Sequence, residues 1–398
     1  MKYKIILSSL FAGVSIFIQA QNNEAMLDTT SHKRSLYESI AGDKAKTLSA
    51  HMNFHFCTTG TADFEDFSMT ETKFRMRRLR MEIYGSFAPK FSYHFRQSFN
   101  HETKPGIEDN IASSVELAFV KWSPSPKFSL TTGKQFMALS GYECWVNGVK
   151  VREFSDFNNT LSPCQVGIAG TYHFNPNHEV TLQVVNNRSN KDEDTYAYGL
   201  PVGVEKSKVP LTATANWIGY FLDRALMLQY SASLGKMAKG HNVTYLTCGN
   251  VWERGPILAY LDFMYSREGL DSKGLISNIP TINEEGKGVT AQYAEYFTTI
   301  ANFDYRFHPR WNAFVKGVFE TGGIYRTNNM YEKGLYRKTW NAQVCLEYLP
   351  LKEDSNLRFY LHLLYKQQLL TEKARTLGAA SNNIQRITLG LVYTIPVF

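Results

Sequence analysis

The last stretch of the chain decides the fold: Ile384-Gln-Arg-Ile-Thr-Leu-Gly-Leu-Val-Tyr-Thr-Ile-Pro-Val-Phe398. Apolar residues alternate with polar or small ones, which is the period of a β-strand that has one apolar face. The stretch runs to an aromatic residue with no polar tail behind it. A final strand of this kind is typical of β-barrels in bacterial outer membranes, because the assembly machinery recognises it.

The other end of the chain reads as a secretory signal over residues 1–20. Lys2 and Lys4 precede an apolar run of roughly 14 residues, which is too short to span a bilayer, and Ala20 is the expected cleavage residue. No later segment holds 18 uninterrupted apolar residues. A closed barrel is then the remaining fold that satisfies its own backbone in lipid. We therefore expect residues 21–46 to be a polar periplasmic segment and residues 47–398 to form a barrel in contact with outer-membrane lipid.

Composition agrees with a barrel without proving one. The chain has 23 Tyr and 26 Phe among 398 residues, which suits a lipid face bordered by aromatic girdles. It would also suit a carbohydrate-binding β-sandwich. The net charge of +7 is mild and argues against a nucleic-acid partner, which needs a denser basic stripe.

The order of turns and loops separates these two folds. Short segments rich in Pro, Gly, Asn and Asp alternate with longer polar segments. The short ones lie at 87–90, 124–127, 175–178, 222–224, 254–256, 308–310 and 351–355. The longer ones lie at 58–70, 101–112, 136–162, 189–209, 236–241, 269–288, 322–334 and 369–383. This alternation predicts an all-β, antiparallel transmembrane barrel of about 16 strands, with short periplasmic turns and long extracellular loops.

The strand register can also be predicted. In the segment 340–348, Trp340, Val344 and Leu346 share one phase and should face lipid. Asn341 and Glu347 have the opposite phase and should face a wet lumen. A charge turned to the bilayer midplane costs about 2–4 kcal/mol, so this register is well determined.

No catalytic or metal-binding pattern is found in the sequence. His51 and His55 lie on one face of a strand but about 13 Å apart, too far for one metal ion. The HExxH, P-loop, GxSxG and dinucleotide-binding motifs are absent. We therefore expect no enzyme activity, no cofactor and no metal. The five cysteines show no zinc spacing, and a bridge between Cys144 and Cys164 remains open.

A family resemblance lies in the first third of the chain. The segment Phe74-Arg-Met-Arg-Arg-Leu-Arg-Met-Glu-Ile-Tyr-Gly-Ser-Phe87 precedes the aromatic segment 90–99, and a further hairpin at 115–135 ends in Gly-Lys-Gln. This region resembles the phosphate-selective porin O and P family. The resemblance implies ion transport by a sixteen-stranded, trimeric porin whose third loop folds inward and narrows the channel.

The residues themselves predict a cationic lumen. Leu79 and Met81 favour lipid, which turns Arg80 inward, and a bulge near Arg77 would bring the preceding arginines inward too. Guanidinium groups in a narrow channel attract anions, and their planar fork suits phosphate. The predicted pore-lining residues are Arg75, Arg77, Arg78, Arg80, His94, Arg96, Lys316, Arg337, Arg358 and Arg386.

The third loop, residues 136–162, is the predicted constriction. Its charged residues Lys150, Arg152, Glu153 and Asp156 would face the wall. We expect passive diffusion of small, phosphate-like anions. Three alternatives remain open. The loop could be an ordinary surface loop. Inward acids such as Glu82 and Glu116 could pair the arginines, which would leave a general non-selective porin. A plugged barrel could serve as a structural or adhesive platform.

Overall fold

The computed structural model describes residues 49–397, except 101–108, 147, 149, 189–194, 197, 280–287, 329 and 352–355. The expected signal at 1–20, the polar segment at 21–46 and Phe398 lie outside the described residues.

Sixteen antiparallel strands form one closed barrel, in which each strand pairs with its neighbours in sequence and β1 pairs with β16. The predicted fold and strand number are confirmed. The strands are β1 (Ser49–Glu65), β2 (Ser68–Ala88), β3 (Phe91–Ser98), β4 (Val115–Ser125), β5 (Phe128–Phe136), β6 (Cys164–Asn175), β7 (His178–Asn186), β8 (Leu211–Phe221), β9 (Leu226–Ala238), β10 (His241–Arg254), β11 (Ile257–Leu270), β12 (Gln292–His308), β13 (Trp311–Ile324), β14 (Gly334–Tyr348), β15 (Leu357–Leu370) and β16 (Asn382–Pro396).

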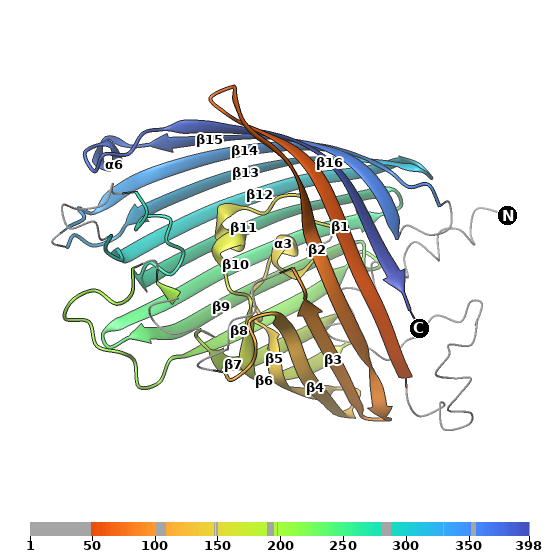
Figure 1. Ribbon diagram of the computed structural model, residues 1–398. Coiled ribbons are helices and arrows are strands. Elements are labelled where there is room, and N and C mark those ends of the chain that lie inside the picture. Colours follow the sequence, from red (N-terminus) through yellow and green to blue (C-terminus); the bar gives the residue numbers. More distant parts are fainter. Residues whose placement is uncertain are drawn as a thin grey trace.

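Long connections gather at one end of the barrel and short turns at the other, on the side of the C-terminus (Figure 1). Two connections expected to be long are tight turns. The polar segment 58–70 is mostly strand, because β1 and β2 continue as one hairpin to the turn Asp66–Phe67, where both residues have positive φ (48° and 65°). In the segment 236–241, β9 and β10 are joined by Lys239 and Gly240, which has a φ of 78°.

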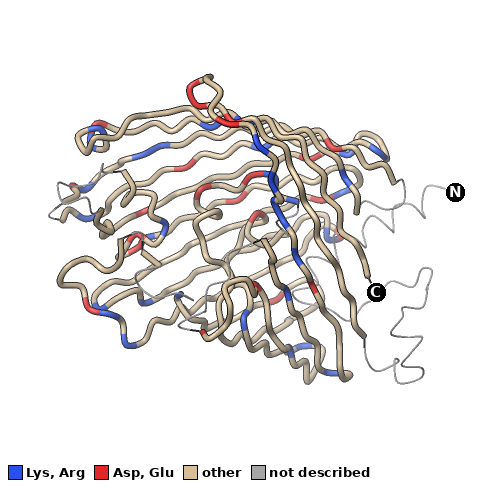
Figure 2. Tube along the Cα trace, viewed as in Figure 1, with Lys and Arg blue, Asp and Glu red and all other residues tan. Residues whose placement is uncertain are grey.

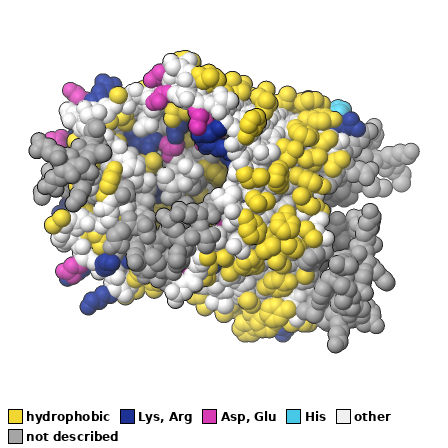
Figure 3. Space-filling model, in the orientation of Figure 1, with side chains coloured by type: hydrophobic (Ala, Val, Ile, Leu, Met, Phe, Trp, Pro, Cys, Tyr) yellow, Lys and Arg dark blue, Asp and Glu magenta, His cyan; other side chains and the backbone are white. Residues whose placement is uncertain are grey.

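The outer and inner faces of the barrel wall carry the apolar and polar side chains that the alternation predicts. Along β14, Trp340 and Val344 are 51% and 49% exposed, whereas Asn341, Gln343 and Glu347 are buried. Hydrophobic side chains cover the outer surface in a broad band (Figure 3). Apolar residues outside and polar residues inside are the pattern of a barrel that lies in lipid.

A β-bulge lies in β2 where the sequence changes phase. Cys57 of β1 pairs with Arg78, but the next residue, Thr58, pairs with Met76, so Arg77 is the extra residue. This insertion lets Met76 and Leu79 both face outward while Arg78 faces the lumen. The predicted bulge is confirmed at this position.

The connections at the loop end share a hydrophobic core, which we name the loop-end core. It includes Leu139, Phe157, Tyr245, Ile276 and Tyr336 among its buried residues. The helix α6 (Glu372–Arg375) also contributes, through a buried alanine. Several outer connections are therefore packed together and not spread over the rim.

Disulfide bonds and membrane-spanning helices are both absent from the described residues. All five cysteines are free, so Cys144 and Cys164 are not paired. Cys144 donates a hydrogen bond to Asn158 Oδ1 at 2.9 Å instead. None of the helices in the described part of the chain is both long and apolar enough to cross a bilayer.

Candidate pore constriction

The third outer connection, residues 137–163 and named L3 here, runs inside the barrel. It carries the short helices α3 (Tyr142–Trp145) and α4 (Asp156–Thr160), which lie within the ring of strands in Figure 1. Its polar groups contact side chains of β8, β9, β10, β11, β13, β14, β15 and β16. These contacts follow half of the wall, so L3 lies across the lumen.

The first helix of L3 is held by a carboxylate on the wall. The backbone N–H groups of Tyr142 and Glu143 donate to Asp262 on β11 at 2.9 and 3.0 Å. The N–H groups in the first turn of a helix have no partner within the helix, and a carboxylate is a strong acceptor for them. Just before α3, the N–H of Ser140 donates to Thr247 Oγ1 at 2.8 Å.

Two glycines let the backbone of L3 touch the wall at this point. Gly141 has a φ of 117°, which L side chains rarely adopt. A Cβ placed on Gly249 of β10 would lie 2.8 Å from the Cα of Gly141. A side chain at Gly249 would therefore push L3 away from the strand.

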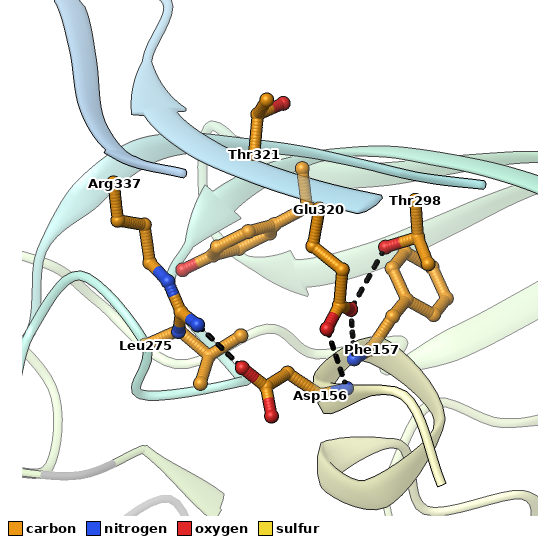
Figure 4. A pocket seen from close by; sticks show the side chains of 8 residues that line it. Asp156, Phe157, Leu275, Thr298, Glu320, Thr321 and Arg337 are labelled. Carbon is orange, nitrogen blue, oxygen red and sulfur yellow. Dashed lines mark hydrogen bonds and ion pairs between the residues drawn. The ribbon is translucent and has the colours of Figure 1, made fainter. Parts of the chain in front are cut away.

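The second helix of L3 is held in the same way. The N–H groups of Asp156 and Phe157 donate to Glu320 on β13 at 3.0 and 3.1 Å, and Thr298 donates to the same carboxylate at 3.1 Å (Figure 4). Figure 4 also shows the side chain of Asp156 turned toward Arg337 of β14. The acceptors of both helices therefore come from strands distant in sequence.

Ion pairs reinforce the attachment of α4. The carboxylate of Asp156 pairs with Arg337 and with Lys366 on β15. Burial opposes ionisation of this carboxyl, but the two cations outweigh it and lower the pKa of Asp156. Asp156 is therefore charged at neutral pH, and two cations on this part of the wall share its single negative charge.

The middle of L3 is attached through Arg152. Its guanidinium pairs with Glu347 and lies 4.0 Å from the ring centroid of Tyr360. Arg358 pairs with the same glutamate at 3.3 Å. Removing one partner of a buried ion pair costs about 3–5 kcal/mol. Arg152 is buried, so it is an anchor of the loop and not an exposed charge.

Glu143 and Glu153 tie L3 to two further cations of the wall. Glu143 pairs with Lys316 on β13 and accepts a hydrogen bond from Ser155 Oγ at 2.7 Å, which joins α3 to the start of α4. Glu153 pairs with Arg386 on β16 at 3.2 Å, and Arg386 also pairs with Asp63 on β1. The acidic side chains of L3 therefore face β13 to β16.

The arginines of β2 meet a different part of L3. Arg77 Nη2 donates to the carbonyl of Val151 at 3.4 Å. A Cβ on Gly148 would lie 2.3 Å from Nη1 of Arg78, so the backbone of L3 passes directly over this guanidinium. Figure 2 shows Lys and Arg recurring along this strand. L3 offers uncharged groups to both arginines.

The arginines of β2 and β3 differ in their partners. Arg80 and Arg96 share Glu116 of β4, at 2.8 and 2.7 Å. The Nη1 atom of Arg78 is buried and has no hydrogen-bond partner among the described residues. We name Arg77, Arg78, Arg80 and Arg96 the arginine cluster. It holds four cations around one nearby carboxylate, with a second, Glu82, further away at 3.9 Å from Arg96.

His94 lies beside the arginine cluster. Its Nε2 is 2.8 Å from one oxygen of Glu82, and Nε2 of His55 is 2.8 Å from the other. Glu82 therefore contacts two imidazoles and is also a second carboxylate beside the arginine cluster, 3.9 Å from Arg96. Across the described residues no group of three or more His, Cys, Asp or Glu side chains is arranged to hold a metal ion.

Two predicted site residues remain to be placed, Arg75 and Lys150. Arg75 is exposed on the outer part of the β1–β2 hairpin, 3.5 Å from the exposed Glu71. Lys150 belongs to L3, where burial and the nearby Arg358 lower its pKa to about 8. It is therefore mostly protonated at neutral pH and loses its charge in mild alkali.

Sequence reasoning missed the importance of Asp262 and underestimated Glu320. Both acids lie on the inward phase of their strands, and the alternation of Leu261, Asp262 and Phe263 predicts an inward acid. The sequence does not show which group each of these acids contacts in the folded chain. Their partners are backbone N–H groups of L3, which leave no trace in side-chain patterns.

A closed barrel of sixteen antiparallel strands, with a loop attached inside it, defines the class of outer-membrane porins. The chain belongs to the phosphate-selective porin O and P family, which it matches over residues 51–395. It is therefore a channel protein of the bacterial outer membrane and not an enzyme.

Solved structures share the fold at low sequence identity. The outer-membrane channel DcaP of Acinetobacter baumannii superposes with a TM-score of 0.61 at 13% identity, covering 88% of this chain and 98% of that one. OmpF of Salmonella typhi gives 0.53 at 10%, covering 87% and 97%. OmpT of Vibrio cholerae, in its trimer form, gives 0.52 at 11%, covering 88% and 100%. No curated protein matches the chain in sequence.

Proposed function

We propose that this porin conducts small anions, phosphate-like ones preferentially, through a lumen that L3 narrows. The observation that supports this most is the arginine cluster, in which the Nη1 of Arg78 lies buried without a hydrogen-bond partner among the described residues. A guanidinium binds two oxygens of a phosphate in one plane, and desolvation strengthens the attraction. L3 adds no acid on this side, since Gly148 and Val151 face these arginines.

The same contacts reduce the number of residues assigned to the solute. Lys316, Arg337, Arg358 and Arg386 each have a carboxylate partner, and so do Arg80 and Arg96. We assign Lys316, Arg337 and Arg386 to attachment of L3, Arg358 to the wall carboxylate Glu347 that also holds Arg152, and the arginine cluster to the anion path. Within the cluster, Arg78 is the residue with the strongest claim to bind a passing anion.

The test is the reversal potential of the purified protein in a planar bilayer under a KCl gradient, followed by titration with phosphate. We expect anion selectivity and a current that phosphate blocks. Arg78→Gln should weaken the block by about tenfold, the loss of one charge-assisted bond. The control is Arg254→Gln, at the exposed turn end of β10, and it should leave the block unchanged.

A general diffusion porin is the second candidate, and the pairing of Arg80 and Arg96 with Glu116 favours it. In that case the pore would select weakly, phosphate would not block it, and Arg78→Gln would change nothing. Absence of any conductance from correctly folded protein would instead indicate a plugged barrel that serves as a surface platform.

We further propose that the mature protein, without residues 1–20, is a homotrimer. Strands β3 to β8 have 8–12 residues, whereas β9 to β16 have 13–17, so the wall is lower on one side. About 9–11 residues are needed to cross a bilayer as a tilted strand, so the shortest strands barely span it. Contact with neighbouring copies would cover this low side. Native mass spectrometry would reveal monomers if the proposal is wrong.

A further inference from the structure

One lysine of the sixth outer connection, residues 271–291 and named L6 here, packs onto L3. Lys273 is only 6% exposed. Its ammonium lies 4.2 Å from the ring centroid of Phe157, 5.1 Å from that of Tyr245 and 5.7 Å from that of Tyr296. The three rings belong to α4, β10 and β12. A cation from an outer loop is therefore enclosed by the constriction helix and two strands of the wall.

A fourth contact fixes the position of this ammonium. Nζ of Lys273 lies 2.6 Å from Oε1 of Glu268, which is itself fully buried at the end of β11. Lysine is rarely buried unless its charge is paired, and aromatic faces attract a desolvated ammonium strongly. The charge of Lys273 thus favours the arrangement in which Phe157 stays against it.

The turn that carries Lys273 is itself held rigidly. The carboxylate of Asp271 accepts the N–H groups of Gly274, Ile276 and Ser277 at 2.8–3.0 Å. It also accepts the hydroxyl of Tyr296 at 2.7 Å. With the hydroxyl of Ser277 as a fifth donor at 2.8 Å, this carboxylate fixes the path of the described part of L6 relative to β12. Lys273 is therefore presented to α4 from a preformed turn.

L6 also contacts α4 through an apolar residue. Leu275 lines the same small pocket as Asp156, Phe157 and Glu320 (Figure 4). It packs against the loop-end core, of which Phe157 is a member. Glu320 of the wall thus holds the backbone of α4, while L6 packs against its buried side chain, Phe157.

We propose that Lys273 is a positioning residue for the constriction, and that L6 sets how steadily L3 stays in place. The proposal rests on the proposed function, because it takes L3 as the segment that narrows the pore. Lys273 does not touch the solute path through the arginine cluster. Substitution of Lys273 should therefore make the open conductance level less steady and leave the ion preference of the pore unchanged.

The test combines single-channel recording with hydrogen–deuterium exchange of the full-length protein. In Lys273→Met the side chain keeps its length but loses its charge. We expect amide exchange in residues 156–160 to become roughly tenfold faster, the order expected for losing a desolvated cation–π contact. Single channels should flicker between levels. Lys273→Arg, which keeps the cation, should restore slow exchange and a steady level.

Matched variants separate this effect from a general loosening. Lys239→Met removes an exposed outer lysine that pairs with the exposed Glu205 at 2.8 Å, and neither residue contacts L3 in the described structure. It should behave as the parent protein. If Lys273→Met does not fold, as judged by heat-modifiable gel mobility, Leu275→Ala tests the same contact with a smaller change and should accelerate exchange in residues 156–160.

Two results would overturn the inference. One is unchanged exchange of residues 156–160 in a folded variant, and the other is faster exchange with an unaltered, steady conductance. Both are independent of ion preference, so they are distinguishable from failure of the proposed function. A cation-selective reversal potential would reject the anion path, and the exchange data would still decide whether Lys273 positions α4.

Discussion

The two sides of the inner wall carry similar cations and use them differently. On β13 to β16, Lys316, Arg337, Lys366 and Arg386 each pair with an acid of L3. On β2 and β3, the arginine cluster has the shared Glu116 and a more distant Glu82. The difference comes from L3, whose acids all face one side and whose uncharged groups face the other. The partner of an arginine, more than its presence in the lumen, indicates whether it is available to a solute.

The largest expected effect comes from removing the wall carboxylates that hold L3. The double variant Asp262→Ala and Glu320→Ala removes the acceptors of four backbone N–H groups. Leaving a buried donor without an acceptor costs about 1–3 kcal/mol, so the loss over four donors is on the order of 5 kcal/mol or more. L3 should leave the wall, and single-channel conductance should rise several-fold relative to the parent protein.

Glu205→Ala with Glu332→Ala is the control for this experiment. Both acids are exposed and pair with lysines of the outer connections at 2.8 and 3.1 Å. This variant should conduct as the parent protein does. An unchanged conductance in the folded Asp262 and Glu320 variant would show that L3 does not limit the pore.

A smaller effect should follow from inserting bulk where L3 touches the wall. In Gly249→Val the new side chain meets the backbone of Gly141, and overpacking of this kind costs about 1–3 kcal/mol. The open level should become noisy in single-channel records. Gly317→Val on β13 is the matched control, because nothing among the described residues lies within 4 Å of its Cβ. Equal noise in both variants would contradict a specific contact at Gly249.

The smallest effect concerns the charge that L3 itself adds to the lumen. The pKa of Lys150 is lowered to about 8 by burial and by Arg358, so this lysine is mostly protonated at pH 7 and mostly neutral at pH 9. Loss of a cation weakens anion preference, and the reversal potential should move a few millivolts toward zero over this interval. Lys150→Met should lack this step. A step that persists in the variant would assign the titration to another group.

The sequence predicted the barrel well, because its signals are local and repeated. Trp340 and Val344 outside and Asn341 and Glu347 inside follow directly from a period of two. The hairpin of β1 and β2 was mistaken for a loop, since the segment 58–66 is rich in Thr, Gly and Asp. Pairing with β16 on one side and β2 on the other makes these residues a strand.

The attachment of L3 could not be predicted to the same extent. Tyr142 and Asp262 are 120 residues apart in sequence, and Asp156 and Glu320 are 164 apart. Because the donors are backbone groups, no side-chain pattern marks them. The ion pair of Arg152 with Glu347 is likewise a meeting of distant residues. Sequence reasoning identified the charged residues of L3 but not which part of the wall each one meets.

The pairing of β1 with β16 also constrains how the protein is made. The register runs from Asn53 opposite Pro396 to Glu65 opposite Ile384, so the ring closes between segments more than 300 residues apart. Contacts of such sequence separation form late, because the entropy of closing the intervening chain is lost first. Until synthesis reaches β16, β1 retains an unpaired edge that could join a foreign strand. A chaperone that shields this edge would protect the nascent chain from aggregation throughout that interval.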